Sequence, residues 1–444
     1  MQEAAALSLP LFRQQAASWP AALLRLVLLI GGAAIVAVAC GPLQLPEQAA
    51  SAPPPAAGPP QASRAPVAVA APVLLPPAAA PPRKIALLLP LSGAQQVAGE
   101  AVRDGFIAAY LADAGGPRPD VAILDEERPG PAAAYQAALD GGAQAVIGPL
   151  LKESVAEVAR LAGSVPLLTL NYLDAAAPPG AFYQFALAPE DEAQAVAGRA
   201  AARGQLRALV LAPATEWGRR LLGAFTTAIE ARGGTVVAQY LYDPAARDYT
   251  APIQRLLLLD ESRARQRQLV ANLGVPLEFE PRRRGDVDCI FLVASTASGR
   301  LIRPQLRFLY AGDLPTYATS AIYQPGTAGD IDIEGIMFTD APAVIGTDPR
   351  AGALRASLAA RWPPPALSQL RLYAMGYDAY ALLQALVSGN GPGLTPLAGL
   401  SGILTVDESH RIHRDMAWAM FRDGQIVPPG DALPTTSGDP ADPQ

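Results

Sequence analysis

The sequence is poor in the side chains on which most enzymes and metal sites depend. Its 444 residues include two cysteines, Cys40 and Cys289, and two histidines, His410 and His413. Charged residues make up only 17% of the chain and its formal net charge is −6. The densest basic cluster, residues 282–284, is three arginines, for which a solvated loop is expected. Because no longer basic block exists, no nucleic-acid partner is expected.

The short motifs that usually mark catalysis are also absent. The chain has no Gly-x-x-x-x-Gly-Lys loop, no His-Glu-x-x-His, no Gly-x-Ser-x-Gly elbow and no Cys-x-x-Cys. His410 and His413 have no neighbouring cysteine to complete a metal site, and we interpret them as surface residues. Asp125-Glu126-Glu127 could form a paired-carboxylate site, but a solvated turn is favoured. No enzymatic activity, cofactor or metal is therefore expected.

The N-terminal part of the sequence has the features of an export signal. Residues 26–39 form an uncharged apolar run preceded by Arg13 and Arg25. This run is too short for a bilayer core, which needs roughly 20 apolar residues, but it is typical of a signal peptide. Its end, Ala37-Val38-Ala39-Cys40, resembles a lipobox, in which the cysteine is acylated and becomes the new N-terminus. We therefore predict a signal peptide over residues 1–40 and lipidation at Cys40.

The next segment, residues 41–83, consists mainly of proline, alanine and small polar residues. It has neither helical nor strand periodicity, and it has too little bulky apolar surface to offset the entropy lost on ordering. A disordered tether is predicted here, with a reach on the order of 100 Å at about 3.1 Å per residue. Gly41, rather than aspartate, follows Cys40, which favours the outer membrane by the usual sorting rule.

From Lys84 onward, short apolar runs alternate with amphipathic stretches. Residues 84–90 and 145–149 have the continuous apolar character of strands buried on both faces. The stretch after the first run carries apolar residues at helical spacing. Strands alternating with helices indicate an α/β fold whose sheet is mostly parallel and doubly wound.

The alternation occurs twice. Residues 84–187 and 207–320 form two similar α/β units, and the remainder up to residue 425 is expected to complete both. Within the second unit Cys289 lies in an apolar run that predicts a buried strand, so a core role is expected. This arrangement predicts a two-lobed clamshell over residues 84–425, followed by a disordered tail over 426–444. Ligands of such sheets bind at the carboxyl ends of the strands, which here face a cleft between the lobes.

Several motifs carry a family resemblance. Residues 85–93 and 146–150 resemble the type I periplasmic binding proteins, the fold of branched-chain amino-acid receptors. The C-terminal half is similar to the LppC-type lipoproteins, the penicillin-binding protein activators. The motifs that carry this likeness are residues 318–323, 332–340, 371–380, 400–404 and 418–424. Together they extend the resemblance over about residues 84–425.

The resemblance implies candidate residues for a ligand in the cleft. Receptors of this fold hold a ligand carboxylate with hydroxyls and with backbone N–H groups at helix N-termini. Residues at matching strand ends are Ser92, Gly93, Ser154, Thr169 and Tyr172 in the first lobe, and Thr215, Ser295 and Thr296 in the second. Each hydroxyl also fits the role of a helix N-cap, so whether a small molecule binds stays open.

The resemblance also implies a function. The chain is expected to be a non-enzymatic outer-membrane lipoprotein, anchored at Cys40, whose partner is a bifunctional penicillin-binding protein that synthesises peptidoglycan. The alternative is a substrate-binding lipoprotein of an amino-acid ABC transporter, which has the same fold. The best-known activators carry a helical-repeat domain before the binding-protein domain, and residues 41–83 cannot supply one. Any contact with a synthase is then expected to come from the binding-protein-like domain itself.

Overall fold

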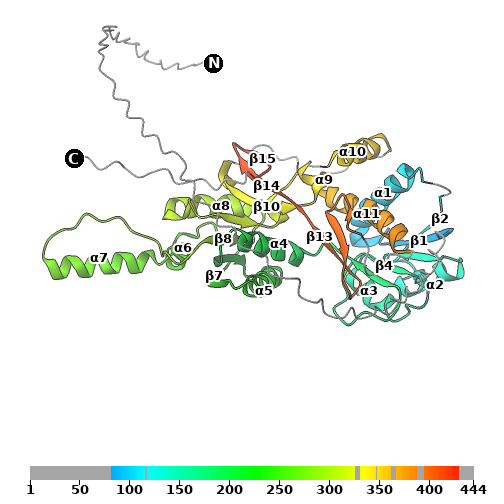
Figure 1. Ribbon diagram of the computed structural model, residues 1–444, viewed down its shortest axis with the longest axis horizontal. Helices are drawn as coiled ribbons and strands as arrows, with labels where there is room; N and C mark the ends of the chain where they lie inside the picture. The colour runs from blue at the N-terminus through cyan, green and yellow to red at the C-terminus, as the bar shows by residue number, and fades with distance from the viewer. Residues whose placement is uncertain are drawn as a thin grey trace, which may run out of the picture. The chain divides into compact units, whose positions relative to one another are not determined.

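The computed structural model describes residues 82–115, 118–325, 331–346, 348–361, 367–387 and 395–429. Cys40, the proposed signal peptide and nearly all of the tether lie outside these residues. Within them the chain forms two α/β lobes, each built on its own sheet (Figure 1). None of the helices in these ranges is long and apolar enough to cross a membrane.

The first lobe is built on an eight-stranded sheet in the order β11-β12-β13-β5-β4-β3-β1-β2. Its strands are β1 (Lys84–Leu89), β2 (Asp120–Asp125), β3 (Ala145–Ile147), β4 (Leu167–Thr169), β5 (Phe182–Phe185), β11 (Leu397–Ala398), β12 (Ile403–Val406) and β13 (Arg411–Asp415). Its helices include α1 (Gln96–Ala112), α2 (Pro131–Asp140), α3 (Lys152–Val158), α9 (Pro342–Ile345), α10 (Pro349–Arg361) and α11 (Leu370–Val387).

The second lobe is built on a seven-stranded sheet in the order β15-β14-β10-β9-β8-β6-β7. Its strands are β6 (Arg207–Pro213), β7 (Thr235–Tyr242), β8 (Cys289–Leu292), β9 (Thr316–Ala318), β10 (Ile336–Asp340), β14 (Ala417–Arg422) and β15 (Gln425–Val427). Its helices include α4 (Pro189–Ala202), α5 (Glu216–Glu230), α6 (Thr250–Leu256), α7 (Leu259–Leu273), α8 (Thr296–Leu306) and the short η2 (Arg307–Ala311).

The apolar runs become strands buried on both faces, as predicted. In β1 the side chains alternate, so that Ile85, Leu87 and Leu89 face α1 and α11 whereas Ala86 and Leu88 face α2 and α3. The pairings of β1 with β2 and β3, and of β6 with β7 and β8, are all parallel. Cys289 is buried in β8 as expected. The prediction of two mostly parallel, doubly wound lobes is confirmed.

Helices α1 and α11 pack unusually closely over the first sheet. A Cβ at Gly105 would lie 2.0 Å from the carbonyl oxygen of Tyr373, and one at Gly376 would lie 2.0 Å from that of Val102. Each helix thus presents a glycine to the backbone of the other. Gly376 belongs to the 371–380 motif, so this close approach explains why that motif contains a glycine.

The C-terminal strands are divided between the two sheets. Strand β13 pairs with β12 and β5 in the first sheet, whereas β14 pairs with β10 and β15 in the second. Met416, which is buried, separates β13 from β14. The chain therefore passes from one sheet to the other at this residue and ties the lobes together.

Candidate functional site at the junction and cleft between the lobes

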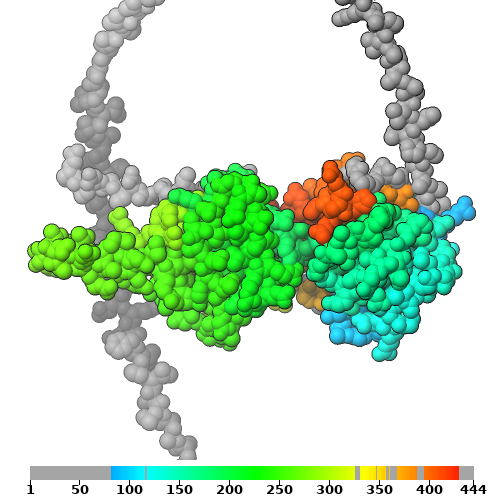
Figure 2. Space-filling model, turned by 90° about the horizontal axis from the view of Figure 1, so that it is seen from below, coloured from blue at the N-terminus to red at the C-terminus, as the bar shows by residue number. Residues whose placement is uncertain are grey.

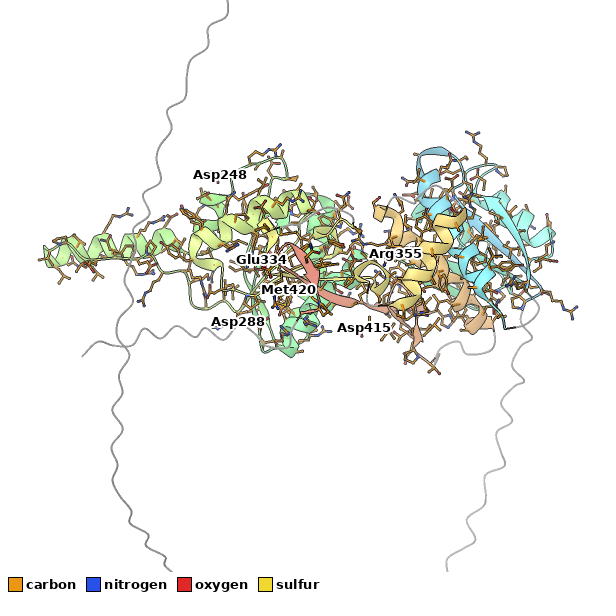
Figure 3. All side chains as sticks on the ribbon, turned by 90° about the horizontal axis from the view of Figure 1, so that it is seen from above. Asp248, Asp288, Glu334, Arg355, Asp415 and Met420 are labelled. Atoms are coloured by element: carbon orange, nitrogen blue, oxygen red, sulfur yellow. The ribbon has the colours of Figure 1, made fainter. Side chains whose placement is uncertain are left out.

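Within the described residues the chain passes between the lobes three times. It does so between β5 and α4, between β10 and α9, and between β13 and β14. Figure 3 shows Asp415, the last residue of β13, between the two lobes, and Met420 of β14 within the second lobe. The backbone around these three crossings forms the junction, and polar side chains gather there.

Arg371 of α11 is the central side chain of the junction. Its guanidinium binds Asp340 through two bonds, Nη2 to Oδ2 at 2.6 Å and Nε to Oδ1 at 2.9 Å. Nη2 also donates to the carbonyl oxygens of Ser320 and Tyr323 at 3.0 and 3.1 Å. The Asp340 side chain is only 2% exposed and that of Arg371 is 26% exposed, so the carboxylate is removed from water and the arginine is largely buried.

Asp378, two turns further along α11, holds a second junction segment. Its carboxylate accepts hydrogen bonds from the backbone N–H groups of Leu400 and Ser401, both at 2.7 Å, and from the Ser401 hydroxyl at 2.5 Å. Burial raises the pKa of Asp378 to about 6, although these three bonds favour the ionised form.

These contacts connect four of the C-terminal motifs. Arg371 joins the motif over 371–380 to those over 318–323 and 332–340, and Asp378 joins it to the motif over 400–404. The resemblance therefore rests largely on one physical feature, the polar scaffold of the junction.

Glu192 of α4 completes this scaffold from the side of the second lobe. Its carboxylate accepts bonds from the Ser320 N–H at 2.8 Å and from the Ser320 hydroxyl at 2.9 Å. Burial raises its pKa to about 7, although the nearby Arg414 opposes this shift. Arg414 is itself buried, and its Nε and Nη2 atoms make no hydrogen bond within the described residues. The junction thus keeps at least two ionisable groups away from water.

The raised pKa values predict how stability depends on pH. Burial raises the pKa of Glu192 from 4.5 to about 7, and that of Glu126 by the same amount. Between about pH 4.5 and 7 the folded chain then binds more protons than the unfolded chain, so the free energy of unfolding falls as pH rises. Carboxyl groups whose pKa is lowered by folding change the free energy of unfolding only below about pH 4, so they do not alter this trend. We expect a higher melting temperature at pH 5.5 than at pH 8.

One variant tests how much Glu192 contributes to this pH dependence of the melting temperature. Glu192→Gln should flatten the decline between pH 5.5 and 8, whereas Glu153→Gln, at an exposed position of α3, should leave it unchanged. Melting curves followed by circular dichroism supply the measurement. Equal slopes for wild type and Glu192→Gln would show that Glu192 is not the titrating group.

Beside the junction lies a cleft with a volume of about 720 Å³. Its lining comes from the carboxyl ends of the first lobe's strands, from the first crossing and from Arg220 of α5. Tyr172 lies in it and its hydroxyl is 2.8 Å from the carbonyl oxygen of Ile412 and 3.1 Å from Asp191 Oδ2. Burial raises the pKa of Tyr172 well above its usual range, so the phenol stays protonated.

The charged groups of the cleft largely bind one another. Lys152 pairs with Asp174 at 2.8 Å, and Arg220 pairs with Glu190 at the opposite wall. The Arg411 guanidinium stacks over the Tyr172 ring, 5.3 Å from its centroid. A small anionic ligand would have to compete with these internal partners.

Of the candidate ligand-binding residues, only Tyr172 lines this cleft. Ser295 and Thr296 line a separate pocket of about 320 Å³ beside Arg371. The remaining candidates are Ser92 and Gly93 at the start of a 3-10 turn, Ser154 buried in α3, Thr169 bonded to the Tyr183 carbonyl, and Thr215. Ligand binding by this set stays a prediction, since the structure does not bring its members together.

Two of the hydroxyls act as helix N-caps. Thr215 Oγ1 accepts from the Gly218 N–H at 3.2 Å, and Ser295 Oγ accepts from the Ser298 N–H at 3.3 Å. The N-cap role weighed against ligand binding therefore holds for both residues.

The interpretation of Asp125-Glu126-Glu127 as a solvated turn is wrong for Glu126. Its side chain is buried and accepts the N–H groups of Leu150 and Leu151 at 3.0 and 3.1 Å. It thereby fixes the two residues that precede α3, a contact between segments too far apart in sequence to be seen in the acidic triplet.

The histidines also acquire structural partners. His413 Nε2 lies 2.8 Å from Asp407, and His410 stacks on Tyr183. Within the described part of the chain, no group of three or more histidine, cysteine or acidic side chains could hold a metal ion.

The junction residues Arg371, Asp340, Asp378 and Glu192 were not singled out from the sequence. A signal was present for two of them, because Arg371 and Asp378 are charged residues within an otherwise apolar helical stretch. A charge at such a position calls for a buried partner.

Comparison with known proteins agrees with this fold. The chain is 31% identical over 352 residues to the penicillin-binding protein activator LpoA of Photobacterium profundum, covering 78% of this chain and 56% of that protein. For the same activator of Vibrio antiquarius the identity is 30%, with coverages of 76% and 57%. The chain thus spans a little over half the length of these curated relatives.

Solved structures show the same likeness. One is the C-domain of LpoA (YraM) from Haemophilus influenzae, a regulator of PBP1A, with 26% identity, a TM-score of 0.62 and coverage of 78% of this chain and 100% of that one. Another is a putative branched-chain amino acid ABC transporter from Chromobacterium violaceum, with 25% identity, a TM-score of 0.56 and coverages of 76% and 99%. The predicted type I periplasmic-binding-protein-like fold is confirmed.

A family model described as LppC putative lipoprotein matches residues 59–424, well over half of the sequence. The motifs that first suggested this family, and the junction contacts that connect them, lie within the matched region. The chain belongs to the LppC putative lipoprotein family.

Proposed function

We propose that the chain is a non-enzymatic lipoprotein that binds and activates a peptidoglycan synthase, a penicillin-binding protein, from the periplasmic face of the outer membrane. The observation that carries the proposal is the match to the entire length of the LpoA C-domain from Haemophilus influenzae, which is described as a regulator of PBP1A. The part of the relatives' length that this chain shares is thus a complete structural unit.

The polar groups of the cleft are poorly suited to the capture of a small ligand. Its charged groups are paired with one another, and two of the eight candidate residues cap helices. A receptor for a free amino acid needs converging donors that are available to the ligand. The transporter alternative is supported by the likeness to the Chromobacterium violaceum structure, which is weaker in TM-score.

The proposed organisation follows from the family and the sequence. Residues 1–40 are a signal peptide, Cys40 carries the lipid, and residues 41–83 are a tether. The working domain begins at residue 84 and extends to residue 427, two residues further than predicted, because β15 (Gln425–Val427) pairs with β14; residues 428–444 are the tail. A tether on the order of 100 Å, at about 3.1 Å per residue, would let the anchored domain reach a partner away from its own membrane.

Thermal shift and direct binding distinguish the two functions. An activator should show no rise in melting temperature with any of the twenty amino acids, and it should bind an immobilised bifunctional penicillin-binding protein of the same organism. A receptor should gain about 2.7 kcal/mol of stability from its ligand at a hundredfold excess over Kd. A clear shift with one amino acid, together with no binding to the synthase, would overturn the proposal.

A further inference from the structure

The second lobe carries an extension that projects away from the body of the lobe. Residues 260–286, here called the arm, comprise most of α7 and the segment that returns to β8. Leu258 has a φ of 57°, a left-handed conformation that ends α6 and lets α7 leave in a new direction. Figures 1 and 2 show α7, in yellow-green, projecting from the body of the second lobe, and its main tertiary contact is with α6.

The arm leaves large apolar side chains exposed to solvent. Leu269 and Leu273, one turn apart on α7, are 52% and 59% exposed. In the returning segment Val275 and Phe279 are exposed as well. Four exposed large apolar residues thus lie within residues 269–279, and such a concentration marks interaction sites more often than single exposed residues do.

A second exposed apolar group adjoins the base of the arm. In η2, which packs against α6, Phe308 is 79% exposed and Tyr310 is also exposed. Tyr310 has a φ of 63°, which is strained for an aromatic residue. Arg283 of the arm binds Asp313, two residues beyond η2, at 2.6 Å. The base of the arm and η2 thus adjoin, and together the arm and η2 hold six of the twelve exposed large hydrophobic residues in the described ranges.

The charges on the arm indicate what it binds. Three arginines occupy alternate positions of α7, namely Arg263, Arg265 and Arg267. Arg263 pairs with Asp260 at 3.1 Å, whereas Arg265 and Arg267 form no ion pair with any described residue. The arm and η2 thus combine arginines with exposed aromatic residues, and both residue types are enriched in the energetically dominant part of protein interfaces. The complementary surface is an apolar groove with carboxylates facing α7 and basic side chains facing the returning segment, where Glu278 and Glu280 flank Phe279.

Lipid fits this surface less well. Phe279, the exposed aromatic residue of the returning segment, lies between Glu278 and Glu280 in the sequence. These carboxylates would oppose the approach of an anionic membrane at the residue best suited to insert.

We propose that the arm and η2 form the surface with which this chain docks onto the extracytoplasmic part of its peptidoglycan synthase, on an apolar site bordered by side chains of both charges. This inference rests on the proposed function and adds the location of the contact. It places the contact on the second lobe, away from the cleft.

The arm can be removed at a natural boundary. The Arg282 N–H bonds to Ser262 Oγ at 3.1 Å, which brings the two ends of the projecting part together. Replacing residues 263–281 with a short glycine linker should leave the buried residues Leu257 and Leu259 in place. The melting temperature should then stay within a few degrees of wild type. Binding of the full chain to the purified bifunctional penicillin-binding protein should be lost.

Point variants test the same surface without deletion. Leu269→Ser combined with Leu273→Ser should raise Kd by about tenfold or more. Arg265→Glu combined with Arg267→Glu should weaken binding and reduce its dependence on salt. The matched control is Val97→Ser combined with Leu161→Ser, two first-lobe residues that are 63% and 47% exposed, and it should bind like wild type.

Each alternative gives a distinct result. Wild-type binding that the arm variants retain would overturn the docking surface and leave the proposed function standing. Absence of binding by wild type would overturn both. Arm-dependent binding to anionic lipid vesicles, or arm-dependent self-association in sedimentation, without an effect of the arm on synthase binding, would assign the surface to another occupant and overturn the inference.

Discussion

Replacing Asp340 with alanine should lower the free energy of unfolding by about 3–5 kcal/mol. The variant leaves the Arg371 guanidinium at the junction without the carboxylate that it binds through two hydrogen bonds. A buried charge deprived of its partner keeps its desolvation penalty and loses the compensating attraction. Arg371 of α11 also donates hydrogen bonds to the carbonyl oxygens of Ser320 and Tyr323. If the variant displaces Arg371, these contacts should weaken too, so the loss of stability should affect both lobes.

Urea denaturation followed by circular dichroism measures this change. The control is Asp174→Ala, which breaks the exposed Lys152–Asp174 pair and should cost less than about 1 kcal/mol. Asp340→Asn, which keeps the shape and removes the charge, should fall between the two. If Asp340→Ala were as stable as Asp174→Ala, the junction would not depend on this ion pair.

Replacing Cys40 with serine should release the protein from the membrane fraction or leave it as an uncleaved precursor. The prediction rests on the lipobox-like Ala37-Val38-Ala39-Cys40 and on membership of a lipoprotein family. Each acyl CH₂ buried in a bilayer contributes about 0.8 kcal/mol, so an acylated N-terminus with more than one chain binds durably.

The chain supplies its own control for this experiment. Cys289 is buried in β8, where no acyl group could be attached, so Cys289→Ser should remain in the membrane fraction. Fractionation and intact mass identify the two products. A Cys40→Ser protein that keeps both the location and the mass of wild type would contradict lipidation at this residue.

The sequence predicted the two sheets because their strands are continuous apolar runs. Residues 84–90 are a continuous apolar run that ends in turn residues, which favours a strand buried on both faces. The division of β13 and β14 between the lobes was beyond such reasoning. Alternation of apolar and polar residues indicates a strand but does not identify the sheet that it joins.

The junction was unpredictable for a different physical reason. Asp340 and Arg371 lie 31 residues apart, and hydrophobic periodicity carries no information about which polar groups meet. Glu126 shows the same limit, since its acidic neighbours suggest a solvated turn while its partners are 24 and 25 residues away. The family motifs located these residues without giving their contacts.

The central claim is that this chain stimulates a peptidoglycan synthase through direct contact. Its most direct test is the initial rate of glycan polymerisation by the purified bifunctional penicillin-binding protein, measured with increasing amounts of residues 41–444, which lack the apolar run over 26–39 and Cys40. We predict a saturable rise in rate with the otherwise wild-type chain and none with the variant that lacks residues 263–281. An unchanged rate at concentrations where the chain is bound to the synthase would contradict the account.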